Sequence, residues 1–123
     1  MQDWNVALER LRGAYADATI EGYRKDFALF VGWCLDEGLL PLPASPETIV
    51  RYLNDQIVRL KANTLTRRIA AIVRVHRLLG FASPKDDEEV RLALRRAKRF
   101  RPARPPSAWH HPRSALADDR ELW

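Results

Sequence analysis

The sequence predicts an all-α protein, a compact orthogonal bundle of four to five helices. Apolar residues recur three and four positions apart in five segments, as they do on one face of an α-helix. Residues that start or stop helices separate these segments. Hydrophobic residues make up 46% of the 123 residues, which is enough for the core of one domain of ordinary size.

The first expected helix is short and covers about residues 4–15. Gly13 weakens it, because glycine in a helix costs about 1 kcal/mol relative to alanine. We therefore treat residues 1–16 as an N-terminal short helix, an appendage to the main domain. Its apolar face carries Trp4, Leu8, Leu11 and Tyr15.

The second expected helix runs from about Ala18 to Glu37. Asp17 or Thr19 is expected near its N-cap, and Gly38 fits the stop at the other end. One apolar stripe follows the whole helix and predicts a long buried face. The stripe consists of Ile20, Tyr23, Phe27, Phe30, Val31 and Cys34.

The third expected helix follows the proline-rich connection LLPLPASPET and runs from Pro46 to about Leu60. Ser45 is a good N-cap, and Pro46 suits the first helical position. Four apolar residues at helical spacing predict its buried face. They are Ile49, Leu53, Ile57 and Leu60.

The fourth expected helix, about residues 64–80, has one apolar side and one basic side. Asn63 or Thr64 is its expected cap, and Gly80 ends it. At 100° per residue, the side chains expected inside are Leu65, Ile69, Ile72, Val73, His76 and Leu79. Those expected outside are Arg67, Ala71 and Arg74, with Arg68 and Arg77 on the flanks.

The fifth expected helix begins in FASPKDDEEV and ends near Phe100. Its acids at 86–89 match the positive end of the helix dipole, and its last turn is basic. The main domain thus spans residues 17–100. Residues 101–123 contain four prolines and no long apolar period, so we expect a basic, proline-rich linker or tail.

The charges are unevenly spread along the chain. Residues 1–55 hold five basic and nine acidic side chains, whereas residues 56–104 hold fourteen basic and four acidic ones. Residues 56–85 contain no acid at all. This asymmetry favours a polyanionic partner, most plausibly nucleic acid. The alternative is that the basic face is merely solvated, or pairs with the acids of the first half.

The residues that most often carry catalysis do not form a site in this sequence. Cys34 lies on an apolar stripe, which indicates a buried structural thiol, and His76 reads as a hydrogen-bonded core histidine. His110 and His111 are adjacent rather than spaced as zinc ligands are. We therefore expect no catalytic residue, no metal and no cofactor.

Nothing in the sequence suggests a membrane or a secretory route. No apolar run approaches the roughly 20 residues that span a bilayer. The first ten residues lack the pattern of a signal peptide. A single cysteine excludes an intrachain disulfide and suits a reducing cytoplasm, which is the predicted location.

The basic helix over 64–80 has the chemistry of a DNA-reading element. Arginine forks suit phosphate oxygens and guanine edges. The polar residues Asn63, Thr64 and Thr66 cluster at its N-terminal end, where backbone N–H groups also favour phosphate. An α-helix fits the major groove, and its N-terminal part usually reaches deepest.

Four ordered motifs resemble the N-terminal core-binding domain of tyrosine recombinases, the Cre/Xer-like phage-integrase family. They are T-x-x-x-Y-x-x-D-x-x-x-F-x-x-W-C from Thr19, P-A-x-P-E-x-x-x-x-Y-L from Pro43, T-x-x-x-x-x-x-A-I-x-x-x-H-x-x-x-G from Thr64, and P-x-x-x-x-x-V from Pro84. The match covers about residues 17–100. The ordered set is more specific than any single piece.

The resemblance implies a SAM-like helical bundle that forms one jaw of a clamp around duplex DNA at a recombination site. It implies contacts with other recombinase subunits in a tetrameric synapse, and no small-molecule substrate. It also places Glu21 and Gly22 near the DNA. The predicted DNA-binding residues are Thr19, Lys25, Asn63, Thr64, Thr66, Arg67, Arg68, Ala71, Arg74, Arg99 and Arg101.

The resemblance does not extend to catalysis. The family's catalytic arginines, histidines, lysine and tyrosine belong to a C-terminal domain that we expect to be absent, so this chain is not expected to cut or join DNA alone. Two alternatives stay open. One is a helical protein-interaction module anchored by Trp109 and Trp123, and the other is a truncated competitor of a full-length recombinase.

Overall fold

The computed structural model describes residues 3–100, and this part of the chain is all-helical, as predicted. The elements are α1 (Trp4–Glu9), α2 (Asp17–Glu37), α3 (Pro46–Gln56), α4 (Ala62–Leu78), the short 3-10 helix η1 (Pro84–Asp86) and α5 (Glu88–Arg99). The expected tail over 101–123, which includes Arg101, His110, His111, Trp109 and Trp123, lies outside the described residues.

Several helix ends follow directly from local sequence. Ser45 caps α3 by accepting a hydrogen bond from the Thr48 N–H, with Pro46 as the first helical residue. Asp87 caps α5 by accepting from the Glu89 and Val90 N–H groups. Gly38 ends α2 in the left-handed conformation, at φ 71°, which an L side chain rarely adopts.

Other helix ends differ from the prediction. Helix α1 stops at Glu9, before a turn in which Gly13 has φ 87°, and α3 stops at Gln56 although Ile57 and Leu60 continue its apolar pattern. The N-cap positions of α2 and α4 are Ala16 and Lys61. Asp17 lies next to the N-cap of α2, as expected, whereas the predicted cap of α4 at Asn63 or Thr64 is wrong. Those two side chains lie in the first helical turn instead.

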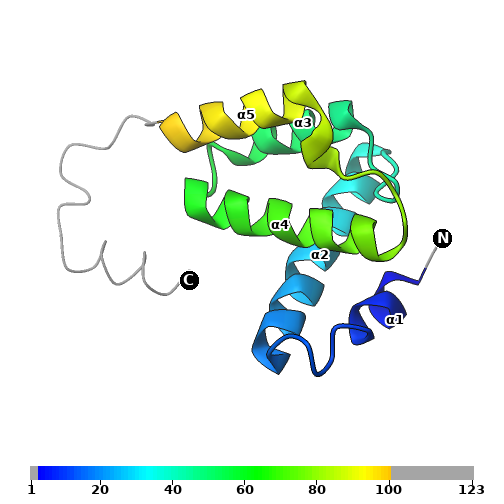
Figure 1. Ribbon diagram of the computed structural model, residues 1–123. Coiled ribbons are helices and arrows are strands. Elements are labelled where there is room, and N and C mark those ends of the chain that lie inside the picture. Colours follow the sequence, from blue (N-terminus) through cyan, green and yellow to red (C-terminus); the bar gives the residue numbers. More distant parts are fainter. Residues whose placement is uncertain (1–2, 101–123) are drawn as a thin grey trace, which may run out of the picture.

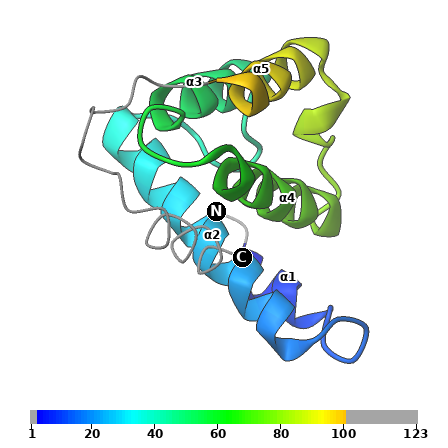
Figure 2. The same cartoon turned by 90° about the vertical axis from the view of Figure 1, so that its left-hand side faces the viewer.

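The helices are arranged around α4. Helices α3 and α5 lie side by side on one side of it, and α2 crosses it on the other side (Figures 1 and 2). Helix α1 lies beside the first half of α2 and also contacts α4. Because α4 is covered by neighbours on two sides, only a narrow outward strip of it remains accessible.

The core is continuous through the bundle. Phe30 of α2 packs edge-on against Tyr52 of α3, with ring centroids 5.0 Å apart, and Tyr52 packs edge-on against Trp33. Burying each large apolar side chain stabilises the fold by about 1.5–3 kcal/mol. The largest fully buried side chains include Phe27, Phe30, Tyr52, Leu8, Ile20, Ile49, Leu53, Leu65, Ile69 and Ile72.

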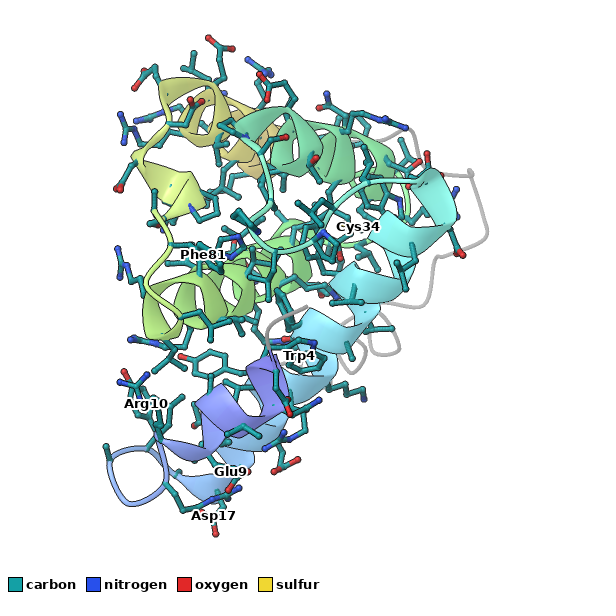
Figure 3. The ribbon with its side chains drawn as sticks, turned by 90° about the vertical axis from the view of Figure 1, so that its right-hand side faces the viewer. Trp4, Glu9, Arg10, Asp17, Cys34 and Phe81 are labelled. Carbon is teal, nitrogen blue, oxygen red and sulfur yellow. The ribbon has the colours of Figure 1, made fainter. Side chains whose placement is uncertain are left out.

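Helix α1 is part of this core and not an appendage to it. Leu8 is fully buried, and the Trp4 ring packs edge-on against Phe27 at 4.9 Å between centroids. Arg10, just after α1, donates a hydrogen bond to the Leu78 carbonyl at the end of α4 (2.8 Å). Figure 3 shows Trp4 where α1 meets α2. Packing against α2 and α4 thus stabilises a helix too short to form alone.

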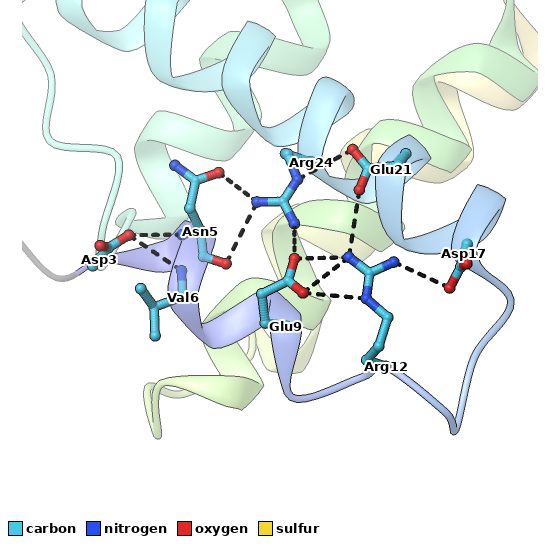
Figure 4. A network of polar contacts seen from close by, with 8 residues as sticks. All are labelled: Asp3, Asn5, Val6, Glu9, Arg12, Asp17, Glu21 and Arg24. Carbon is cyan, nitrogen blue, oxygen red and sulfur yellow. Dashed lines mark hydrogen bonds and ion pairs between the residues drawn. The ribbon is translucent and has the colours of Figure 1, made fainter.

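A polar network joins α1 to the start of α2 (Figure 4). The Arg12 guanidinium meets Glu9 at 2.8 Å, Asp17 at 3.1 Å and Glu21 at 3.6 Å. Arg24 bonds Glu21 and also reaches Glu9. Exposed ion pairs of this kind contribute little each. Together they pair three acids of residues 1–55 with the nearby Arg12 and Arg24.

Candidate nucleic-acid interface

The accessible strip of α4 is polar and basic. Asn63, Arg67, Ala70 and Arg77 are exposed, and the side chains of Thr66 and Arg74 are half-buried between them. The strip starts at the N-terminal turn of α4 and continues to its last turn. A small residue between two arginines lets another surface approach this strip closely. In the structure that small residue is Ala70.

Three of the predicted contact residues do not lie on the strip. Ala71 is fully buried and Thr64 is 3% exposed, so the prediction that Ala71 faces outward is wrong. The reason is that neighbours on two sides of α4 bury a wider arc than one apolar stripe. Arg68 is also turned inward, with its side chain only 15% exposed.

Arg68 is held inside the fold by two partners. Its Nη1 donates to the Tyr52 hydroxyl at 3.1 Å, and its Nε lies 4.0 Å from Asp26 Oδ1. Burial raises the pKa of Tyr52, so the phenol is neutral at pH 7. A buried guanidinium needs a carboxylate nearby, and Asp26 supplies it. Arg68 therefore has a structural position rather than a surface one.

Arg67 meets the same carboxylate from the surface side. Its Nε donates to Asp26 Oδ2 at 3.1 Å, while its side chain remains 44% exposed. Asp26 itself is only 2% exposed and belongs to α2. The ion pair therefore fixes the direction of a surface arginine and joins α2 to α4.

The start of α2 borders the strip. Thr19, Gly22 and Asp26 are three and four positions apart and so share one side of the helix. Thr19, Gly22 and Lys25 are exposed. Since Asp26 contacts Arg67, this side of α2 faces α4. Glu21 is instead engaged by Arg12 and Arg24.

The remaining predicted residues are spread more widely. The Thr66 hydroxyl donates to the Ala62 carbonyl (3.0 Å), and the Arg74 guanidinium lies over the Tyr15 ring at 5.2 Å from its centroid. Arg99 is exposed at the end of α5. In Figure 1 this end lies on the same side of the bundle as the beginning of α4.

The acids of the first half do not neutralise the basic strip as a whole. Glu9, Asp17 and Glu21 pair with Arg12 or Arg24, and Glu37 pairs with Arg51 at 2.7 Å. Asp26 is the exception, because it meets Arg67 and Arg68. Over residues 3–100 no carboxylate lies within ion-pair distance of Arg74 or Arg77.

Two residues considered for chemistry are structural. Burial raises the pKa of the Cys34 thiol to about 12, which leaves no thiolate at pH 7. His76 Nε2 accepts a hydrogen bond from the Ala44 N–H (2.9 Å), and its Nδ1 lies 2.8 Å from the Ile72 carbonyl oxygen. Burial lowers the pKa of His76, so the ring is neutral. The prediction of a hydrogen-bonded core histidine is confirmed.

Within residues 3–100 the structure holds no group of three or more side chains suited to a metal ion. In the same range, no helix is both long enough and apolar enough to cross a membrane.

Sequence reasoning missed the central role of Asp26. The signal was present, because an acid stands between Tyr23 and Phe27 in an otherwise apolar stripe. A buried carboxylate of this kind requires a cationic partner. The sequence does not show which arginine that partner is, because Arg67 and Arg68 are adjacent and forty-one or more residues away.

Comparison with known proteins finds one informative relative. The chain is 43% identical over 96 residues to a protein named integrase/recombinase xerD homolog from Selenomonas ruminantium. The aligned segment covers 76% of this chain but only 28% of the relative. No protein-family model matches the chain.

Proposed function

Since the chain belongs to the tyrosine recombinase family, we propose that residues 17–100 are its core-binding domain and bind duplex DNA. In this proposal the domain, of SAM-like type, forms one jaw of a clamp at a recombination site. The aligned segment spans only 28% of the relative, so the proposal does not extend to the whole recombinase activity.

The observation that supports DNA binding most strongly is the basic strip of α4 beside the start of α2. Residues 56–85 contain no acid, and Asp26, whose carboxylate meets Arg67 of the strip, is buried. An α-helix fits the major groove, which is about 12 Å wide. The strip thus places basic side chains along a helix, an element whose width suits that groove.

The structure favours different roles for the predicted residues. In the proposal Asn63 and Arg67 reach base edges, because they lie in the N-terminal half of α4, which enters deepest. Thr19 and Lys25 contact the backbone from α2. Arg68 acts through Asp26 and Tyr52 by fixing the seam between helices. Thr64 and Ala71 fill the core behind the strip.

Two further parts of the proposal concern the molecule's surroundings. Other recombinase subunits are its protein partners, assembled as a tetrameric synapse on DNA in the cytoplasm. The described residues bind DNA rather than cut it, which is supported by a thiol and an imidazole that are both buried and engaged in the core.

The proposal predicts binding that depends steeply on salt. If the domain neutralises about five phosphates, log K falls with log salt at a slope near −4 to −5, because each contact releases condensed counterions. Fluorescence anisotropy with a labelled duplex, from low to moderate salt, measures this slope.

The control for nonspecific attraction is an acidic protein that has a negative charge similar to that of the duplex and carries the same label. If the chain binds that protein as tightly as it binds the duplex, and if the affinity for the duplex does not change with salt, DNA binding is contradicted. That result would favour a protein-interaction module.

A further inference from the structure

A hollow of about 380 Å³ lies beside the second half of α4. Arg74 and Arg77 of α4 and Lys85 of η1 line it, together with Tyr23 of α2 and Asp86. Ala70 and Val73 form its apolar part. Two elements, α4 and η1, therefore bring three cations and one acid to the same depression, and α2 adds a tyrosine.

The cations of this hollow are not neutralised by the fold. Over residues 3–100 no carboxylate lies within ion-pair distance of Arg74, Arg77 or Lys85, and this includes Asp86. By contrast, Arg12, Arg24, Arg51 and Arg91 all meet acids. The hollow is therefore a local concentration of positive charge with room for an anion.

Arg74 is held in a fixed orientation there. Its guanidinium lies over the Tyr15 ring, and its buried Nε has no hydrogen-bond partner. A buried donor without an acceptor is costly. An anionic oxygen in the hollow would meet the charge of this guanidinium, which no carboxylate of residues 3–100 neutralises.

We propose that this hollow binds a backbone phosphodiester of duplex DNA, with Arg74, Arg77 and Lys85 as its ligands. The proposal rests on the proposed DNA-binding function and adds a site that lies away from the base-reading end of α4. Arg74 and Arg77 follow Arg67 by seven and ten residues, or about 10 and 15 Å along the helix. The first distance is close to the width of a major groove, about 12 Å, and the second exceeds it, so a helix reading bases at its start meets backbone at its end.

Two features of the hollow oppose an anion, and the fold offsets one of them. The carbonyl end of a helix repels negative charge, but Arg77 lies in the last turn of α4 and Arg10 donates to the Leu78 carbonyl. The Asp86 carboxylate remains as a repulsive group. Removing the charge of Asp86 should therefore strengthen anion binding, whereas removing a cation of the hollow should weaken it.

The test compares duplex affinities of the full chain and its variants by anisotropy. Arg77→Ala with Lys85→Ala should weaken binding on the order of tenfold and reduce the salt slope by about one, because one phosphate contact is lost. Asp86→Asn should tighten binding. Lys85→Arg should retain wild-type affinity. Arg95→Ala, which removes one exposed positive charge from α5 outside the hollow, gives the loss expected per charge, and the double variant should exceed twice that loss on a logarithmic scale.

Two duplexes of unrelated sequence should show equal losses, because a phosphate contact carries no sequence information. Thermal unfolding followed by circular dichroism checks that each variant is folded. If the double variant does not exceed twice the loss of Arg95→Ala, or if Asp86→Asn has no effect, the phosphate site is wrong while DNA binding stands. If the wild-type chain does not bind duplex DNA, both proposals fail.

Discussion

Asp26 links the core of the protein to its proposed working surface. Its carboxylate is buried, yet it meets Arg67 at the surface and stands near the inward-turned Arg68. Removing one partner from a buried ion pair is more costly than the pair is stabilising, because it leaves a charge without compensation. The structure of the seam between α2 and α4 should therefore depend on this one side chain.

The substitution Asp26→Asn should lower the free energy of unfolding by about 2–4 kcal/mol, because Arg68 would stay buried without a carboxylate. Urea denaturation followed by circular dichroism measures this loss. Arg67→Ala is the matched comparison. Arg67→Ala removes the hydrogen-bond donor of the buried Asp26 carboxylate but leaves Arg68 at 4.0 Å, so it should cost about 1–2 kcal/mol of stability. Duplex binding should weaken by about 1–3 kcal/mol if Arg67 reads a base.

Equal stability losses in the two variants would show that Asp26 serves only Arg67. No loss in Asp26→Asn would mean that the ion pairs at the seam are not formed in solution.

Single residues were predictable where one face of a helix decided their place. Cys34 and His76 lie in the core as their apolar neighbours indicated. The sequence did not show which of Ala70 and Ala71 is buried, because these consecutive residues lie on either side of the edge of the buried face. Which of the two is covered depends on how many neighbours pack against α4, and periodicity alone does not contain that information.

At the scale of elements, helix ends marked by glycine, proline or a capping side chain were predictable, as at Gly38, Ser45 and Pro46. The ends of α1 and α3 were not. Their apolar spacing continues past the last helical residue, and Leu11 and Leu60 still contact the core from turns. Tertiary packing, rather than a local stop signal, ends these helices.

Helix α2 offers a matched pair of probes. A Cβ added at Gly22 or at Gly32 meets nothing within 4 Å, so each change to alanine should stabilise the helix by about 0.5–1 kcal/mol. Gly22 lies on the side of α2 that borders the strip, so Gly22→Ala should also weaken duplex binding several-fold by blocking close approach of the backbone. Anisotropy and thermal unfolding together measure both effects.

Gly32→Ala is the control of this pair. It should stabilise the helix to the same extent and leave duplex binding unchanged. Equal affinities for the two variants would exclude close contact between DNA and the start of α2.

Across the whole molecule, the fold explains how the uneven charge of the sequence is distributed. The acids of α1 and early α2 pair with Arg12 and Arg24, and this leaves α4 basic. The sequence predicted a basic helix and the protein family of the chain. It did not predict the hollow at η1, because Tyr23, Arg77 and Lys85 come from three elements and meet only in the folded chain.

The central claim is that the α2–α4 face binds duplex DNA, and backbone amide chemical shifts of the labelled chain during titration with a duplex test it most directly. The account predicts shifts concentrated in residues 19–25 and 62–77, with small changes in residues 46–56 and 88–95. Shifts centred on α3 and α5, with the amides of α4 unchanged, would contradict it.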